Sequence, residues 1–265
     1  MSGLGRYLRL LRIFWANAVA TELEYRVNFW SNAFLSLFWL VWAAAGIGVY
    51  FRFTQAVRGW TYPEMLVVVG LFFAVNGVRQ AVITPNLARI SEYVRLGTLD
   101  FLLTKPVDSQ FMVSFRNVRI YSLLDPVLGL GLVAVGMASA HRALTVGGAA
   151  IGLLLMACSI AILYAVSLAL MSAGIGWVSS EGMDDLVQGL VETSRLPVAL
   201  YRGVVQTALT VVLPVAFLTT VPAEALLGRS VGKAGLLAPV VAVVAVALAS
   251  AWWRRALRSY TGASA

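Results

Sequence analysis

The sequence has very few of the side chains on which redox and metal chemistry depend. Cys158 is the only cysteine and His141 the only histidine among 265 residues, so neither a disulfide framework nor a Cys/His metal cluster can be assembled. Charge is scarce as well, at 12% of residues against about 25% in soluble domains. Too few polar groups remain to cover a soluble globule, which excludes that class of protein.

Apolar side chains take the place of the missing charge. They make up 60% of the chain, and the mean hydropathy of +0.84 excludes intrinsic disorder. Because a membrane-crossing helix needs about 20 apolar residues, the length allows about six or seven crossings and leaves little for a soluble domain. We therefore expect an integral membrane protein, with any catalytic domain on another chain.

The predicted fold is all-α, a polytopic membrane protein made of one transmembrane domain over 1–265. An N-terminal interfacial helix is expected over 4–26 and a cytoplasmic segment over 85–116. Arg79, near the end of the second span, is expected to extend to the lipid headgroups. The six predicted spans cover 29–51, 62–84, 120–144, 145–172, 203–223 and 234–253.

The distribution of basic residues predicts the orientation of these spans. With an even number of spans both termini lie on one side, and fifteen of the 20 Lys and Arg residues fall on that side, Arg195 and Arg202 among them. Basic residues concentrate on the cytoplasmic side of membrane proteins, so both termini are predicted to be cytoplasmic. The same asymmetry accounts for the net charge of +8 without a nucleic-acid partner.

The first segment has the pattern of an amphipathic helix on the inner leaflet. Arg6, Arg9 and Arg12 project from the side opposite an apolar face that includes Trp15. Only three apolar residues separate Arg12 from the small residues at 16–20, which is too short for the apolar core of a cleavable signal peptide. Membrane lipid is therefore the expected partner of this helix.

Two glycine motifs resemble nucleotide sites only superficially. Gly228–Ala234 has one residue too few between its glycines for a phosphate loop, and an alanine where magnesium needs a hydroxyl. Gly129 and Gly131 fit a relaxed dinucleotide fingerprint but lie inside a predicted span. We therefore expect no cofactor and no catalytic residue in this chain.

Asp125 lies within the third predicted span and has two interpretations. An intramembrane carboxylate is by default a functional hypothesis, here a place on a substrate path. The sequence Asp125-Pro126 is also typical of a helix N-cap followed by proline, and we favour that interpretation.

The segment between the second and third spans carries the most information. Apolar and charged positions alternate at helical spacing, a glycine ends the pattern, and a second apolar piece runs to Pro106. A short amphipathic helix over 86–96 is therefore predicted, either as a simple interfacial anchor or as a docking element. The candidate residues are Leu87, Arg89, Ile90, Glu92, Tyr93, Val94, Arg95, Leu96 and Gly97, the last of which ends the helix.

The run that begins Arg95-Leu-Gly97-Thr-Leu99 and ends Lys105-Pro106-Val107 resembles the segment after the second span in ABC-2-type transporter permeases. The shared pattern is a basic residue, a glycine, a leucine-rich stretch and a proline followed by an apolar residue. The N-terminal interfacial helix and the six spans are similar too.

This resemblance implies the membrane subunit of an ATP-driven exporter in a bacterial inner membrane. The helix over 86–96 would dock in a cleft of a separate ATPase subunit, and its nine named residues would be coupling positions. Two permease chains, identical or homologous, would pair with two ATPase chains that hold ATP and Mg. The family's re-entrant gate helices would have to come from 217–227 or be nearly absent, because the loop before the last span is short.

Two other functions compete with this one. A secondary transporter could use Asp125, Glu64 or Arg79 along a substrate path, although the sequence has no convincing internal repeat. An intramembrane enzyme ranks last, because the spans hold neither a His/Glu metal set nor paired aspartates.

Overall fold

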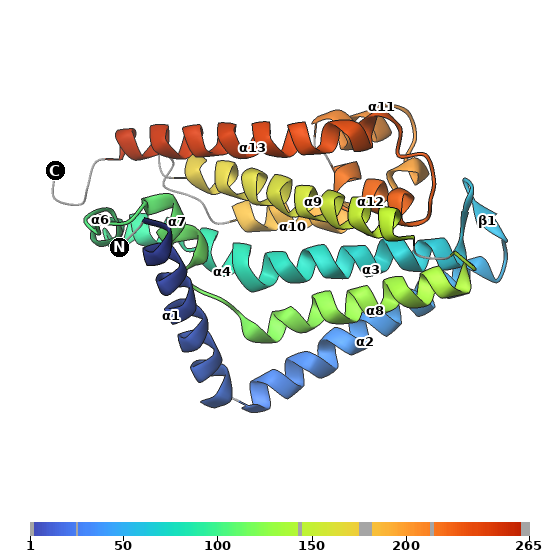
Figure 1. The fold of residues 1–265 in the computed structure, drawn as a ribbon, viewed down its shortest axis with the longest axis horizontal. Coiled ribbons are helices and arrows are strands. Elements are labelled where there is room, and N and C mark those ends of the chain that lie inside the picture. Colours follow the sequence, from blue (N-terminus) through green and yellow to red (C-terminus); the bar gives the residue numbers. More distant parts are fainter. Residues whose placement is uncertain (1–2, 25, 143–144, 175–181, 213–214, 261–265) are drawn as a thin grey trace.

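The computed structural model describes residues 3–24, 26–142, 145–174, 182–212 and 215–260. The chain is 82% helical, and the expected all-α polytopic fold is confirmed. The long helices run side by side as a bundle, and α1 projects from one end of it (Figure 1). A small hairpin lies at the opposite end.

The elements follow in this order. The first half contains α1 (Gly3–Glu24), α2 (Arg26–Phe51), β1 (Ala56–Val57), β2 (Trp60–Thr61), α3 (Tyr62–Val78), η1 (Arg79–Ile83), α4 (Thr84–Leu87), α5 (Ile90–Arg95), α6 (Leu99–Leu103), α7 (Ser109–Phe115) and η2 (Ile120–Leu123). The second half contains α8 (Leu124–Ser139), α9 (Val146–Ala173), α10 (Met183–Thr193), η3 (Val198–Leu200), α11 (Gly203–Thr207), η4 (Ala208–Val212), η5 (Val215–Phe217), α12 (Thr220–Leu226) and α13 (Gly232–Ser259).

Five helices in the described part of the chain are long and apolar enough to cross a membrane. They are α2, α8, α9, α13 and a continuous stretch from α3 to α5. These five overlap the predicted first, third, fourth, sixth and second spans. The predicted fifth span is the exception.

Helices α3 and α8 pack backbone to backbone at glycines. A methyl group on Gly70 would lie 2.5 Å from the carbonyl oxygen of Gly129, and one on Gly136 would lie 2.8 Å from that of Pro63. Such distances leave no room for any side chain, so glycine sets the separation of these two helices. Gly129, whose motif suggested a nucleotide loop, therefore has a packing role.

We expect Gly129→Ala to destabilise the protein by about 1–2 kcal/mol, because the added methyl group would force the α3 and α8 backbones apart. Gly131→Ala is the matched control: its methyl group would meet nothing within 4 Å, on the same helix. The measurement is the thermal midpoint of the detergent-purified proteins. Equal midpoints for the two variants would show that the close approach does not limit stability.

The predicted fifth span over 203–223 is not a straight helix. Two segments, Gly203–Thr210 and Val215–Leu226, are bent by 67° relative to each other. Gly203 has a positive φ, and Pro222 lies in the first turn of α12. Each of these residues marks the start of a new helix, which the mean hydropathy of this stretch does not reveal.

Both ends of this bent pair lie against the hairpin. The carbonyl oxygen of Tyr201 accepts a hydrogen bond from Arg58 at 3.2 Å, and Arg229 donates to the carbonyl oxygen of Gly59 at 2.6 Å. Arg58 and Gly59 are adjacent turn residues between β1 and β2. The pair therefore enters and leaves the bundle at the same end, which is a re-entrant arrangement.

The stretch before this pair runs the length of the bundle instead. Asp184 at the start of α10 bonds Arg79, near the α1 end, whereas Tyr201 reaches the hairpin end. Two sequence predictions are therefore wrong. Arg195 is not at the α1 end, because its guanidinium lies 4.9 Å from the ring centroid of Phe72, in the interior of the α3 sequence. Arg202, next to Tyr201, lies at the hairpin end.

Candidate functional site

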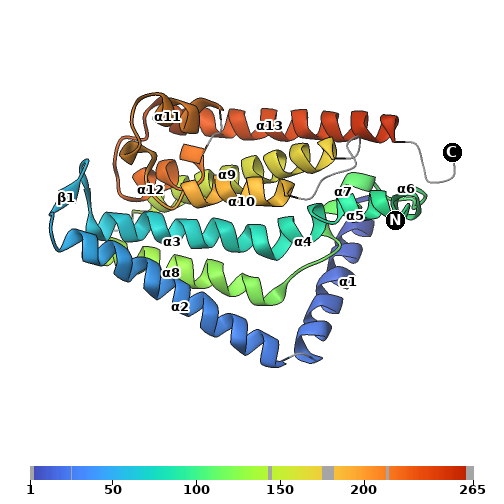
Figure 2. The ribbon, with the colours of Figure 1, turned by 180° about the vertical axis from the view of Figure 1, so that it is seen from behind.

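The segment between α3 and α8 forms one end of the bundle, the end at which α1 begins and α13 finishes (Figure 2). Asn86 links the beginning and the end of this segment by hydrogen bonds. Its side-chain amide donates to the carbonyl oxygens of Val82 and Asn117, both at 2.6 Å, and its Oδ1 accepts from the N–H of Asn117 at 2.8 Å. Residues 86 and 117 are thereby held together, so the segment moves with the end of α3.

Helix α7 connects this segment to three other helices. Gln110 donates to Ser250 of α13 at 2.9 Å, and Ser114 shares a hydrogen bond with Tyr164 of α9 at 2.8 Å. Tyr7 of α1 packs edge-on against Phe111, with ring centroids 4.7 Å apart. A displacement of this segment would therefore act directly on α1, α9 and α13.

The apolar side of the predicted amphipathic helix is buried in this chain. Leu87 is 1% exposed and Ile90 is 0% exposed, and both lie in a core that includes residues of α9 and α13. Tyr93 and Val94 are half-buried against the same core. The expectation that the apolar side of this helix docks into a partner is therefore wrong for Leu87 and Ile90, and it stays a prediction for Tyr93 and Val94. Apolar periodicity identifies a buried side but not what covers it.

The side left exposed differs from the predicted docking face. Leu96 is 59% exposed and Phe101 is 71% exposed, while the neighbours Leu99 and Leu102 are buried. Gly97 has a φ of +66°, so α5 stops where the sequence predicts and the chain turns into α6. Two large apolar side chains thus project from a short turn.

Three exposed charged residues precede this apolar pair in the sequence. They are Arg89, which caps the start of α5, and Glu92 and Arg95 within α5. We define the end surface as these three residues together with Leu96 and Phe101. An aromatic side chain with a charged rim is typical of a protein interface.

The end of α3 holds a buried arginine in an irregular turn. Pro85 has no N–H to give to the carbonyl of Ala81, and the chain forms the π turn η1 before it, in which the N–H of Thr84 bonds the carbonyl of Arg79. The backbone N–H of Arg119 donates to the carbonyl of Ala81 at 2.9 Å. The turn sits where π turns often mark functional positions.

Arg79 points into the bundle, so the prediction that it extends to the headgroups is wrong. Its side chain is 1% exposed and donates to Asp184 Oδ1 at 3.0 Å and to Thr84 Oγ1 at 2.9 Å. A further bond goes to Gln188 of α10. A buried charge needs such partners, and α10 supplies two of them. Arg79 thus joins α3 to α10.

Asp125 lines a cavity of about 580 Å³ between α2, α3, α8 and α10. The favoured N-cap interpretation is wrong, because η2 begins the helical path at Ile120 and Asp125 already lies inside α8. Its Oδ1 is buried and has no hydrogen-bond partner among the described residues. The cavity is otherwise lined mainly by polar side chains, including Asn76 and Glu192.

Helix α1 presents its arginines outward. Arg6, Arg9 and Arg12 are exposed, and Arg6 donates to the carbonyl oxygen of Pro106 at 2.8 Å. Trp15 is exposed as well, whereas the ring of Phe14 packs against the core. The helix therefore has a protein-facing side and a second apolar stripe that faces away from the bundle.

The family model for ABC-2 family transporter proteins matches residues 37–264. The chain belongs to the ABC-2 transporter family. It is accordingly a multi-pass membrane protein and the permease component of an ABC transporter, and membership implies association with ABC ATPase subunits in general. No curated protein and no solved structure matches the permease.

Three features of the permease were not predicted from its sequence. Phe101 lay in an apolar run and was not singled out, although a five-residue helix between Gly97 and Pro106 cannot bury every side. The bond between Arg79 and Asp184 joins residues 105 positions apart and leaves no local signal. Asn86, a polar residue directly after a proline in an apolar stretch, could have been noticed in the sequence. Its hydrogen-bond partner Asn117, 31 residues later, could not have been predicted.

Proposed function

We propose that the permease is the membrane subunit of an ATP-driven exporter, working with a second permease chain and two ATPase subunits that hold ATP and Mg. Energy enters at the end surface. The permease itself hydrolyses nothing; its contribution is a path for the substrate and a set of helices that respond to the ATPase.

The exposed pair Leu96 and Phe101 is the observation that carries this proposal. Both side chains project at one end of the bundle, on a segment bonded to α1, α9 and α13 through α7. An exposed aromatic residue on a segment that also carries exposed charges suits insertion into a cleft of another protein. Motion of that cleft would then be passed to several helices together.

The bond between Arg79 and Asp184 extends this connection into the bundle. Arg79 begins η1, the turn that leads into the segment carrying the end surface, and α10 runs from Asp184 toward the re-entrant pair. The re-entrant pair packs on α9, where Ser159 bonds the carbonyl oxygen of Phe217. We infer that α10 links ATPase docking at one end to a gate at the other.

The experiment that tests this function is co-purification followed by transport. The permease is expressed with a candidate ABC ATPase subunit from the same genome, purified through a tag on the permease alone, and placed in proteoliposomes. Retention of the ATPase and ATP-dependent efflux of an amphipathic fluorescent probe are expected. Efflux driven equally well by an ion gradient without ATP would contradict the proposal.

A secondary transporter is the second candidate, favoured by one observation. Asp125 has an unpartnered carboxylate oxygen in a polar cavity within the bundle, as a proton or cation site requires. In that case Asp125→Asn would abolish gradient-driven transport in vesicles that lack any ATPase. In the exporter, the permease without ATPase transports nothing with or without this change.

We further propose that the chain crosses the membrane six times, with both termini in the cytoplasm and 183–201 as the fifth crossing. In a Cys158→Ala background, Gln55→Cys and Arg202→Cys are expected to react with an impermeant thiol reagent added outside whole cells. Thr104→Cys should be protected until the cells are lysed. All three positions are exposed in the structure. Labelling of Thr104→Cys from outside would show that the orientation is the reverse of the one proposed. Protection of Arg202→Cys would show that residue 202 lies on the cytoplasmic side.

A further inference from the structure

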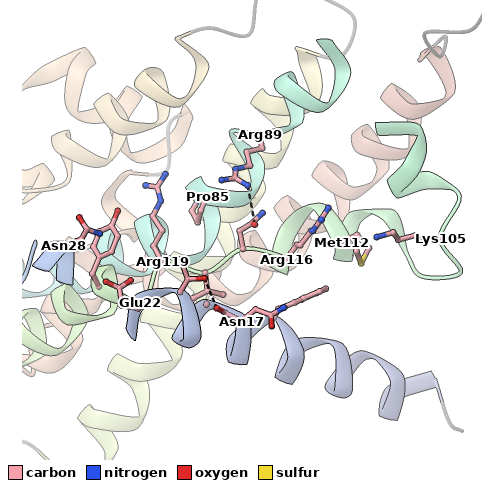
Figure 3. A pocket seen from close by; sticks show the side chains of 15 residues that line it. Asn17, Glu22, Asn28, Pro85, Arg89, Lys105, Met112, Arg116 and Arg119 are labelled. Carbon is pink, nitrogen blue, oxygen red and sulfur yellow. Dashed lines mark hydrogen bonds between the residues drawn. The ribbon is translucent and has the colours of Figure 1, made fainter. Parts of the chain in front are cut away.

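A second, larger cavity lies outside the bundle core, beneath helix α1. Its volume is about 820 Å³, and its lining comes from α1, from α7 and from the residues that lead into α8. Figure 3 shows Asn17 and Glu22 on one wall and Arg116 and Arg119 on the other. The size lies within the range of small-molecule sites.

Four basic side chains line this cavity: Arg89, Lys105, Arg116 and Arg119. Among the described residues, none of them lies within 4.0 Å of an acidic side chain, since the ion pairs there involve other arginines. Four cations against one carboxylate, Glu22, leave an excess of positive charge in the cavity, and a bound anion would reduce the repulsion among the cations. The lining therefore favours an anionic ligand.

The cavity also holds groups suited to the rest of a lipid headgroup. Glu22 is its one acidic residue, and the buried Oε1 of Glu22 has no hydrogen-bond partner among the described residues. That oxygen can accept a bond from a hydroxyl. Phe14, Ala18 and Val118 provide apolar wall for a glycerol backbone and the first acyl carbons.

The place of the cavity in the fold fits a membrane surface. Glu22 lies just before α2 begins at Arg26, and Tyr121 just before α8 begins at Leu124. The starts of membrane-crossing helices mark the level of the lipid headgroups, and basic pockets at that level bind anionic lipids. We propose that this cavity binds the phosphate and hydroxyl groups of an anionic phospholipid such as phosphatidylglycerol. Arg89 belongs to both this cavity and the end surface, and Arg119 also lines the cavity around Asp125.

The test is a titration of the purified full-length permease in detergent, followed by native mass spectrometry. Phosphatidylglycerol is compared with phosphatidylcholine, and glycerol 3-phosphate and inorganic phosphate are tested as soluble anions. Selective retention of phosphatidylglycerol is expected. Equal retention of phosphatidylcholine would overturn the proposal, and tight binding of inorganic phosphate alone would assign the cavity to a free anion instead of a lipid.

Variants locate the site. The double variant Arg116→Gln/Arg119→Gln should lower the affinity for phosphatidylglycerol about tenfold to thirtyfold, since each basic residue near an anionic surface contributes roughly fivefold. The matched control is Arg254→Gln/Arg255→Gln, which removes the same charge from exposed positions on α13. The single variant Lys105→Gln, at an exposed position, should lower it about fivefold if the double variant does not fold. An equal loss in the control would show a non-specific charge effect and reject the site.

Discussion

Phe101→Ala is expected to weaken the association of the permease with its ATPase subunit by about thirtyfold or more, while insertion into the membrane stays normal. Buried aromatic anchors at interfaces typically contribute about 2–4 kcal/mol, and Phe101 is the most exposed large apolar side chain of the end surface. Its removal leaves the permease core unchanged, because its ring is 71% exposed in the chain alone. The measurement is retention of the ATPase on the tagged permease, with ATP hydrolysis of the reconstituted complex beside it.

Two controls separate docking from general damage. Phe53→Ala removes a phenylalanine that is 88% exposed near the hairpin, at the opposite end of the bundle, and should leave association unchanged. Tyr93→Ala should lower thermal stability instead, because Tyr93 packs against the permease core. Wild-type association for Phe101→Ala would remove the end surface from the docking model.

The sequence predicted most of the architecture because long apolar runs have few alternatives in a membrane. The runs that became α2, α9 and α13 hold few charges within their apolar windows, and a helix is the only way to satisfy their backbone groups in lipid. The stop at Gly97 was predictable for a local reason, since glycine tolerates positive φ. Hydropathy and local backbone rules were sufficient at these positions.

The failures have a common cause, which is contact between residues far apart in the sequence. The run over 203–223 is apolar enough for a span, yet Thr219 bonds the carbonyl oxygen of Ser194 and Arg229 bonds Glu64, so the run folds back. Leu87 and Ile90 likewise show the period of an amphipathic helix whether the cover is a partner, lipid or α9. Only the tertiary structure distinguishes these cases.

The hairpin end shows how such a contact is built. Glu64 accepts from the N–H of Thr61 at 2.9 Å as part of a capping box, and the same carboxylate accepts from Arg229 at 2.5 Å. The guanidinium also lies 4.5 Å from the ring centroid of Trp60. The start of α3 is thereby bonded to Arg229, three residues after the re-entrant pair ends at Leu226. Movement of the re-entrant pair would therefore take place next to a fixed contact.

Asp184→Leu is expected to lower stability by about 3 kcal/mol, the largest loss for any single change considered. The variant leaves the guanidinium of Arg79 buried without its carboxylate, and breaking a buried ion pair on one side typically costs about 3–5 kcal/mol. The lower end applies because Asp184 is 35% exposed, so water screens part of the charge. The fraction of monodisperse protein that survives heating in detergent gives the midpoint. Asp185→Leu, at the exposed neighbouring position, is the matched control and should retain the wild-type midpoint.

The double variant Arg79→Met/Asp184→Leu distinguishes a stabilising pair from a transmitting one. Replacing both members of a buried ion pair with apolar residues is often nearly neutral, so the double variant should recover at least half of the lost stability. Transport should nonetheless stay low if ATPase docking reaches the re-entrant pair through this bond between α3 and α10, as proposed above. Recovered stability together with wild-type ATP-driven efflux would show that Arg79 and Asp184 serve only the fold, and the route from the end surface to the gate would then have to run through α7 and α9.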